Sequence, residues 1–433
     1  MRVLVLGAYG LIGEAVARRL LADGHHVAGL GRDTVRASRR LPQIQWIAAD
    51  LAGLTRAGDW LPLLEKIGAE AIVNCAGALQ NGARDDVARV QSAAMRALYD
   101  AAPRTGVTRV IQISAPRADD GADTTFMRTK GEADAALAAT SLDWIILRPG
   151  LVIGPQAYGG TALLRALASV PLVQPALGGM GAIQTVALTD VADAVARAVR
   201  GDIPVHATYD LVEDEAHSLD EVARAMRHWL GWSDAPGPMV PAWAVALGAR
   251  IGDALGWLGW RPPLRTTAIR ELQAGVTGDP GPWRAATGAP LSSLSATLAA
   301  MPSTVQERWF ARSFLLKPAV IATLSAFWLV TGIVTLLDPE AAARVLTLRG
   351  LPHGLATSFA VGGALVDIAL GLAMLWRPAM MAAAQGMIVV TLAYLAGGTL
   401  LAPDLWADPL GPLVKAVPAM LLAVVALAWT EDR

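Results

Sequence analysis

The chain has 433 residues, of which 54% are hydrophobic and only 17% are charged, and its mean hydropathy is +0.43. This length suggests two or three domains, and the apolar share, well above that of a typical soluble protein, indicates that one of them lies in a membrane. A formal net charge of -1 excludes the basic field that nucleic-acid binding needs.

Short apolar runs alternate with amphipathic stretches over the first 150 residues, which is typical of a doubly wound parallel sheet. We expect strands at residues 2–6, 27–30, 45–48, 71–73, 109–113 and 144–147. Helices are expected at residues 11–22 and 87–101, and another at 219–230 in the more irregular region that follows. These elements predict a Rossmann-type α/β domain with a small substrate lobe, covering residues 1–300.

The last third of the chain contains four segments with few or no charges. They cover residues 318–337, 355–375, 378–403 and 410–429. Each is long enough to cross a hydrocarbon core of about 30 Å as a helix. We therefore predict an all-α four-helix transmembrane domain over residues 317–433, joined to the first domain by an amphipathic connector at residues 301–316.

The charges around these segments predict their topology. The bases Arg308, Arg312 and Lys317 precede the first segment, and Arg377 lies between the second and third. The other two loops contain Asp338, Glu340, Asp404 and Asp408, with fewer bases. Basic loops stay in the cytoplasm. We expect the N-terminal domain and the C-terminus on the cytoplasmic side of the inner (plasma) membrane, where nicotinamide cofactors are found.

A glycine-rich turn follows the first predicted strand. In this spacing Gly7 permits a tight turn, Gly10 lets the backbone approach a pyrophosphate, and Gly13 allows close helix packing. The helix that begins there directs its N-terminus at the phosphates. The residues expected to bind a dinucleotide are Gly7, Ala8, Tyr9, Gly10, Leu11, Ile12 and Gly13.

The end of the second predicted strand distinguishes NADP from NAD. Gly31 occupies the position of the acid that holds the ribose of NAD, and Arg32 follows as a partner for a 2'-phosphate. The sequence therefore favours NADP(H). Asp33, an acid close to the position that holds the ribose of NAD, leaves NAD(H) as the alternative cofactor.

The first 200 residues resemble an atypical short-chain dehydrogenase/reductase of the NAD-dependent epimerase/dehydratase or NmrA-like type. The resemblance implies further cofactor-binding residues: Asp50, Leu51, Cys75, Ala76, Gly77, Ser114, Lys130, Pro149 and Gly150. Cys75 is the only cysteine, which excludes an intrachain disulfide. In a cofactor loop it is expected to pack and not to act as a nucleophile.

The catalytic pair departs from this family. Its members place a tyrosine, the proton donor, four residues before a lysine, but Lys130 is preceded at that spacing by Phe126, which has no proton to give. The resemblance still implies that Ser114 polarises a substrate carbonyl and that Lys130 holds the ribose. Candidates for another donor are Thr125, Thr129, Tyr158 or a water molecule.

Residues 316–433 resemble the DoxX-like family of four-helix membrane proteins, most clearly in the last loop and helix. Asp367 lies within a predicted span, where a carboxylate is expensive and needs a partner or a pocket. Lys415 and Lys317 are possible partners, or both lysines reach the membrane interface instead. We single out the pair of Asp367 with Lys415. Such a pair would bind a quinone or lipid head group, or would stabilise the packing of the helices. The sequence supports the two roles equally.

Three tryptophans, Trp243, Trp257 and Trp260, fall in an apolar stretch bounded by Pro241 and Pro262. Amphipathic aromatic residues suit a membrane interface, and they suit the core of a substrate domain as well. For this stretch we predict the core.

Together these features predict a membrane-tethered NADP(H)-binding oxidoreductase, with the lipid bilayer and a lipophilic quinone-, isoprenoid- or lipid-like substrate as partners. The alternative, favoured by Phe126, is a non-catalytic NADP(H) sensor or assembly factor that serves a respiratory or other membrane protein. A sugar-nucleotide epimerase or dehydratase ranks last, because it would need the tyrosine and would not explain the spans. No clustered His, Cys and carboxylate spacing predicts a metal.

Overall fold

A computed structural model describes residues 1–83 and 85–430 of the chain. These residues divide into two compact units. Unit 1 holds residues 1–256 and 261–311, and unit 2 holds residues 257–260 together with the chain from residue 312 onward.

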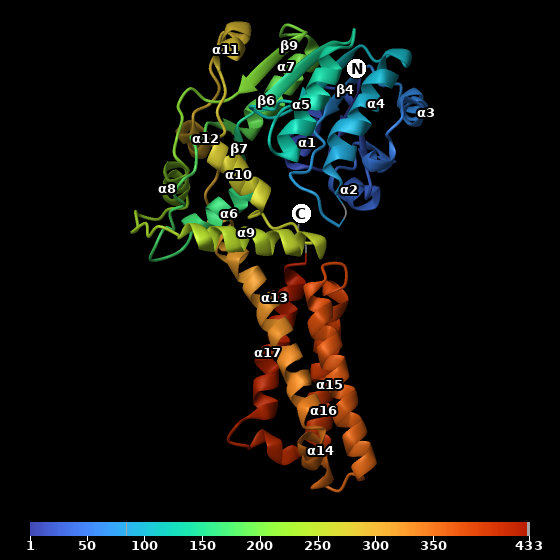
Figure 1. Ribbon diagram of the computed structural model, residues 1–433, viewed down its shortest axis with the longest axis vertical. Coiled ribbons are helices and arrows are strands. Elements are labelled where there is room, and N and C mark those ends of the chain that lie inside the picture. Colours follow the sequence, from blue (N-terminus) through green and yellow to red (C-terminus); the bar gives the residue numbers. More distant parts are fainter. Residues whose placement is uncertain (84, 431–433) are drawn as a thin grey trace. The chain divides into compact units, whose positions relative to one another are not determined.

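Unit 1 is built on a seven-stranded parallel sheet with the strand order β3-β2-β1-β4-β5-β6-β9 (Figure 1). Its strands are β1 (Arg2–Leu6), β2 (His26–Gly31), β3 (Gln45–Ala48), β4 (Ala71–Asn74), β5 (Arg109–Ile113), β6 (Asp143–Pro149) and β9 (Ala207–Leu211). The strands β7 (Leu151–Ile153) and β8 (Thr185–Ala187) form a separate parallel pair. All six predicted strands are present, and β9 is an additional one. The strand order reverses between β1 and β4, and nucleotides bind at such a switch point.

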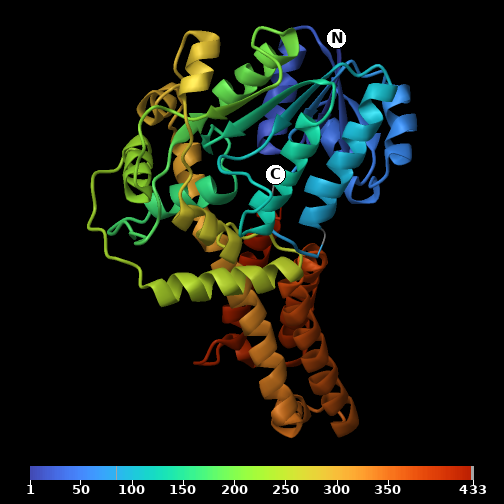
Figure 2. The same ribbon diagram turned by 45° about the horizontal axis from the view of Figure 1, so that its top comes forward.

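Helices cover both faces of the sheet (Figure 2). The helices α1 (Leu11–Ala22) and α7 (Leu188–Arg200) pack on one face, and α3 (Ala57–Ile67), α4 (Ala94–Ala101) and α5 (Thr125–Ala138) pack on the other. Because both faces are covered, residues 3–6 of β1 form an uninterrupted, fully buried apolar run. The predicted Rossmann-type α/β architecture is confirmed.

The remaining elements of unit 1 include a lobe outside the sheet. They are α2 (Thr34–Arg40), η1 (Leu51–Gly53), η2 (Arg89–Ala93), η3 (Ala102–Arg104), α6 (Gly159–Ala168), α8 (Leu219–Trp229), α9 (Ala242–Trp257), α10 (Thr266–Ala274), α11 (Gly281–Thr287) and α12 (Leu294–Ala300). Residues of α6, α8 and α12 share one apolar core, which defines the lobe. A capping box between Ser218 and Glu221 begins α8 at the predicted position.

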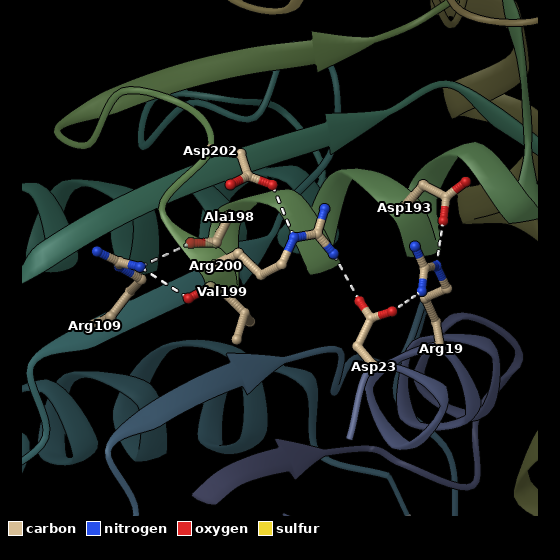
Figure 3. Close-up of polar contacts among 8 residues, drawn as sticks. All are labelled: Arg19, Asp23, Arg109, Asp193, Ala198, Val199, Arg200 and Asp202. Carbon is tan, nitrogen blue, oxygen red and sulfur yellow. Dashed lines mark hydrogen bonds and ion pairs between the residues drawn. The ribbon is translucent and has the colours of Figure 1, made fainter. Parts of the chain in front are cut away.

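Polar contacts fix α7 to α1 and to β5 (Figure 3). Asp23, at the end of α1, accepts from both Arg19 and Arg200, the latter at 2.6 Å, and Arg19 also donates to Asp193 of α7. Arg109 of β5 donates to two carbonyls in the last turn of α7, at 3.2 and 2.9 Å. Helix C-terminal carbonyls lack partners within their own helix, so these bonds stabilise the end of α7.

The described residues of unit 2 form helices joined by loops, without strands. Its elements are α13 (Val305–Leu337), α14 (Pro339–Thr347), α15 (His353–Leu375), α16 (Met380–Leu401), η4 (Pro403–Trp406) and α17 (Pro412–Ala428). By length and apolar composition, α13, α15 and α16 could each cross a membrane. The helix α17 has 17 residues, the lower end of the roughly 17–25 that a span needs, so the fourth span stays a prediction. The four helices share one apolar core.

The helix α13 runs from unit 1 into unit 2 without a break. Residues 305–316 of the predicted connector form its first turns, and Ala311 is buried in the core of the lobe. Its 33 residues correspond to about 50 Å, more than a hydrocarbon core of about 30 Å requires. Part of α13 therefore belongs outside the hydrocarbon region.

Candidate nucleotide and active site

The glycine-rich turn joins β1 to α1 at the switch point of the sheet. Gly7 has a φ of 70°, and a Cβ there would lie 2.9 Å from the Cys75 carbonyl oxygen. A Cβ on Gly13 would lie 2.1 Å from the Gly7 carbonyl oxygen. Gly10 is the N-cap of α1, and its N–H donates to that same oxygen at 2.7 Å. Only glycine fits positions 7 and 13, and the bare backbone at the start of α1 suits a pyrophosphate.

The other residues of the turn are placed by packing. Ala8 is fully buried, Leu11 and Ile12 are partly buried, and Tyr9 is 37% exposed. The Tyr9 ring lies over the end of β2, where a Cβ on Gly31 would be 2.2 Å from Cε1 of Tyr9. An acid at position 31, which holds the ribose in NAD-specific relatives of this fold, would therefore require the Tyr9 ring to move.

The two residues after β2 have different roles. Asp33 caps α2 by accepting the Arg36 N–H at 3.0 Å. Arg32 lies 3.2 Å from the carboxylate of Asp85, which Arg261 also contacts at 2.9 Å. The Asp33 carboxylate is thus committed to its own helix, while two guanidinium groups gather around Asp85.

Two loops at the carboxyl ends of β3 and β4 hold other predicted cofactor residues. The Asp50 side chain caps η1, which begins at Leu51. The Ala76 N–H is held at 3.0 Å by the asparagine side chain two residues earlier. A Cβ on Gly77 would lie 3.7 Å from Nζ of Lys130. The loop after β4 therefore brings the glycine turn and α5 into one site.

Cys75 lies in the same loop. Its N–H donates to the Leu6 carbonyl at 3.0 Å, which fixes the loop to β1. Burial raises the pKa of the Cys75 thiol to about 12, against the attraction of the Lys130 charge. Because a protonated thiol is a poor nucleophile, this environment suits packing better than catalysis.

Helix α5 supplies the reacting end of the site. Phe126, Lys130 and Asp134 follow at four-residue spacing, which places them on one face. Ser114, just after β5, donates to Oδ2 of Asp134 at 2.6 Å, and Arg148 of β6 donates to the same oxygen at 3.1 Å. Ser114, Lys130 and Asp134 are all buried. A serine has one hydroxyl hydrogen, so the Ser114 hydroxyl cannot polarise a substrate carbonyl while it donates to Asp134.

Burial perturbs both titratable groups of α5. It raises the pKa of Asp134, against the hydrogen bonds of Ser114 and Arg148. It lowers the pKa of Lys130, against the attraction of Asp134, and the Lys130 ammonium donates to the Ile113 carbonyl at 2.7 Å. Within the described part of the chain, Oδ1 of Asp134 has no hydrogen-bond partner. The site therefore holds a buried carboxyl with one oxygen left for a water or a ligand.

Phe126 stands where the resembled family has its tyrosine. Its ring centre lies 6.0 Å from Nζ of Lys130, and the ring packs against Ala115, Ala118 and Met127. The position is therefore near the ammonium group, as the resemblance implies, but it presents an apolar edge.

The three residues predicted as alternative proton donors lie in different settings. Thr129 is buried and donates to the Thr125 carbonyl of its own helix at 2.8 Å. The Thr125 hydroxyl accepts from Arg128 at 3.4 Å. Tyr158 is the N-cap residue of α6 and is 44% exposed. Thr129 is thus excluded as a proton donor in this conformation.

The loop after β6 is held tightly. Pro149 ends the strand, and the Gly150 N–H donates to the Leu211 carbonyl of β9 at 3.0 Å. A Cβ on Gly150 would lie 2.4 Å from the Gln184 carbonyl oxygen. The predicted nicotinamide-side loop is therefore rigid backbone at the same edge of the sheet as the glycine turn.

Two residues of the site were not predicted from the sequence. Asp134 had a usable signal, because it follows Lys130 by one helical turn. Asp85 had none, because it lies in an irregular loop and meets Arg32 only in the folded chain.

In unit 2, the predicted pairing of Asp367 with Lys415 was wrong. Asp367 of α15 is buried and accepts from the Tyr394 hydroxyl of α16 at 3.0 Å, and among the described residues it forms no ion pair with Lys415. Lys415 lies exposed in the first turn of α17, where a long side chain can reach water. A Cβ on Gly363 would lie 2.9 Å from the Tyr394 hydroxyl, so this glycine makes room for the pair.

Two family models match the chain. Residues 7–202 match the NAD(P)H-binding model, and residues 325–424 match the DoxX-like family. The chain thus consists of an NAD(P)-binding Rossmann domain followed by a C-terminal DoxX-like domain, and the latter with its three apolar helices indicates a membrane protein.

Two curated relatives are named as reductases. The chain is 28% identical over 310 residues to the 3-diazoavenalumate denitrifying reductase of a Streptomyces species, covering 60% of this chain and 96% of the relative. It is 28% identical over 233 residues to the ceramide reductase of Caulobacter vibrioides, covering 53% of this chain and 70% of the relative.

Solved structures share the Rossmann fold. The Bordetella bronchiseptica enzyme WbmG in complex with NAD is 14% identical with a TM-score of 0.53, covering 71% of this chain and 93% of that one. The enzyme MoeE5 in complex with UDP-glucuronic acid and NAD is 20% identical with a TM-score of 0.52, covering 72% of this chain and 100% of that one. At such identities the likeness shows the fold alone.

Proposed function

We propose that this chain, an NAD(P)-binding Rossmann domain joined to a DoxX-like membrane domain, is an NADP(H)-dependent oxidoreductase that acts on a lipophilic substrate. The observation that carries the proposal is the buried group of Ser114, Lys130 and Asp134 at the same sheet edge as the glycine turn. The reductase names of two relatives support it, and ceramide, named for one of them, is a lipid. Membrane tethering would keep the site close to substrates dissolved in lipid.

The residues of the cofactor end suit NADP(H). The backbone from Gly7 to Gly13 would bind the pyrophosphate, Arg32 the 2'-phosphate and Lys130 the ribose. The lack of an acid at position 31 and the capping role of Asp33 support NADP(H) over NAD(H). Bound NADPH would supply the hydride equivalent for reduction of a substrate.

Asp134 is the proton source in this proposal, and Ser114 passes the proton on. A protonated Asp134 donates across the 2.6 Å contact, which leaves the Ser114 hydrogen for a substrate oxygen. Transfer of that hydrogen, followed by transfer from Asp134 to Ser114, leaves a carboxylate that Arg148 stabilises at 3.1 Å. The raised pKa of Asp134, caused by burial, favours the protonated form that this role needs. The pair would replace the tyrosine that Phe126 lacks.

We place the Rossmann domain and the C-terminus on the cytoplasmic side of the inner (plasma) membrane. Bases flank the start of the first span, and Arg377 lies between α15 and α16. The positive-inside rule supports this orientation, provided that α17 completes a fourth crossing.

The first test uses the purified full chain in lipid nanodiscs. NADPH fluorescence titration measures binding, and NADPH consumption is then followed with a quinone, a long-chain aldehyde and a long-chain ketone. We expect binding and turnover with at least one of these acceptors, against empty nanodiscs as the control. Binding without turnover on any of them would overturn the proposed activity.

The variant Phe126→Tyr separates the proposed proton source from the usual one. A tyrosine hydroxyl beside the Lys130 ammonium would offer a second donor, so we expect a changed pH profile of kcat. An unchanged pH profile would show that position 126 does not face the reacting atoms.

A second function is favoured by Phe126 itself. Without the tyrosine, the domain would serve as a sensor or assembly factor that binds NADP(H) and communicates with a respiratory or other membrane protein. This candidate predicts NADPH binding with no consumption in either the natural chain or the Phe126→Tyr variant.

A further inference from the structure

Helix α9 presents an exposed apolar face, which contradicts the predicted core position of its tryptophans. Trp243 is 71% exposed and Trp257 is 65% exposed, whereas Trp260 is packed into the core of unit 2. Leu247 and Ile251 are also about half exposed, at 51% and 52%. Successive positions are four, four and six residues apart, which at about 100° per residue places the four exposed side chains on one face of the helix.

The opposite face of α9 is attached to unit 1. Gly252 and Gly256 are buried there, and Asp253 accepts from Gln80 and from the Thr266 hydroxyl, each at 2.7 Å. Such close backbone packing and these partly buried hydrogen bonds fix the rotation of the helix about its axis. The apolar stripe is therefore held outward by the fold and is not a consequence of a loosely attached helix.

The charge on the exposed stripe has one sign. Arg250 lies one turn from both Leu247 and Ala254 on the exposed side, and among the described residues no ion pair occupies it. An arginine flanked by tryptophans suits the headgroup layer of a bilayer, where aromatic rings and cations are both favourable.

The chain after α9 is anchored in unit 2. Residues 257–260 belong to unit 2, where the Arg377 N–H donates to the Leu258 carbonyl at 3.0 Å and the Trp260 indole donates to the Leu375 carbonyl at 2.6 Å. Leu375 ends α15 and Arg377 lies in the turn before α16, and both helices are long and apolar enough to span. A turn between consecutive spans lies at the edge of the hydrocarbon region. The C-terminal end of α9 is therefore attached at the membrane surface.

We propose that α9 is an interfacial helix, whose stripe of Trp243, Leu247, Ile251 and Trp257 inserts into the headgroup region of the bilayer. The occupant of this face is lipid, and not a second copy of the chain or another protein. The helix would add a second membrane attachment to the Rossmann unit, beside the spans themselves. It lies at the edge of unit 1, labelled in Figure 1.

The test is site-directed fluorescence in the full chain. Single cysteines are introduced by Trp243→Cys, Leu247→Cys and Ile251→Cys, and by Glu65→Cys at an exposed position of α3 as the control. Each is labelled with an environment-sensitive nitrobenzoxadiazole dye, and the natural chain measures the background from Cys75. The labelled chains are reconstituted into phosphatidylcholine and phosphatidylglycerol vesicles that contain a phospholipid nitroxide placed close to the headgroup, after NADPH binding has been checked.

For groups inserted about 5–10 Å into the interface, we expect the nitroxide to quench roughly half or more of the emission at the three α9 sites, with iodide ineffective. The Glu65→Cys label should behave in the opposite way. Iodide quenching at α9 equal to that of the control would overturn the proposal, since the face would then be in water. Protection from both quenchers would overturn it as well, since protein would then cover the stripe.

A charge reversal gives an independent measurement. Arg250→Glu places a carboxylate among the headgroups, so nitroxide quenching of the Trp243→Cys label should fall in vesicles that contain phosphatidylglycerol. Arg104→Glu, at an exposed position of η3, should leave this quenching unchanged. Equal quenching in the two variants would contradict a role for Arg250 at an anionic surface.

Discussion

The cofactor end and the reacting end of the candidate site are built in different ways. At the cofactor end, the fit depends on backbone and on the absence of side chains, as at Gly7 and Gly13, where a Cβ would meet backbone atoms at 2.9 and 2.1 Å. At the reacting end, the fit depends on side-chain pairs, as between Ser114 and Asp134. The first kind of site tolerates almost no change, whereas the second can exchange its chemistry with a few substitutions while the fold stays the same.

The largest expected effect is at the reacting end. Asp134→Asn keeps the shape of the side chain but removes its proton, so kcat should fall by about 100-fold or more, as on loss of a general acid. Because the protonated form is the active one and burial raises its pKa, kcat of the natural chain should decline as pH rises through that pKa. The Asp134→Asn variant should not show this decline of kcat with rising pH. The measurement is kcat against pH, with Asp100→Asn, an exposed position of α4, as the control; equal profiles would contradict the proposed role.

The next effect tests the cofactor end. Gly13→Ala places a methyl group 2.1 Å from the Gly7 carbonyl oxygen, so the turn must shift. We expect NADPH affinity to fall by about 10–100-fold, which corresponds to an overpacking cost of about 1–3 kcal/mol. Fluorescence titration measures it. Gly58→Ala, where a Cβ would meet nothing within 4 Å, should bind NADPH normally; unchanged affinity in Gly13→Ala would break the comparison.

The third prediction concerns Arg32, at the margin of the cofactor end. Here a side chain, and not the backbone, is proposed to set the preference for NADPH over NADH. Arg32→Ala removes the charged donor proposed for the 2'-phosphate, and we expect NADPH affinity to fall by roughly tenfold while NADH affinity stays constant. Parallel titrations with the two cofactors measure this preference. Arg39→Ala, at an exposed position of α2, the helix that follows Arg32, serves as control. Equal losses for NADPH and NADH would show that Arg32 acts on the fold and not on the phosphate.

The smallest expected effect lies away from both ends. Asp23→Asn weakens the contacts that Asp23 makes with Arg19 and Arg200, and partly exposed ion pairs contribute about 0–1 kcal/mol each. A decrease in the Tm of unit 1 by a few degrees or less, with unchanged NADPH affinity, is the expected result. Thermal unfolding followed by near-UV circular dichroism in detergent measures it. A change in NADPH affinity would show that the α1 and α7 packing controls the site.

The sequence by itself determined the features that depend on short, local patterns of residues: the strands, the glycine turn and the apolar helices. The parallel sheet follows from apolar runs at β1 and β5, and the glycine turn follows from three glycines whose spacing matches one backbone geometry. The long apolar helices follow from composition alone, because a span needs only length and the absence of charge. These features depend on neighbours in the chain.

Only the tertiary structure decided which residues distant in sequence form hydrogen bonds and which face of a helix is exposed. Asp134 meets Ser114 across 20 residues, and Tyr394 in place of Lys415 meets Asp367, because packed helices bring them within hydrogen-bond distance. The strand β9 was missed because its five residues gain their strand character from pairing with β6. The exposed side of α9 was mistaken for core, because an apolar stretch has the same composition whether protein or lipid covers it. The sequence supplied the hydrophobicity of Trp243, and only the fold shows which way it faces.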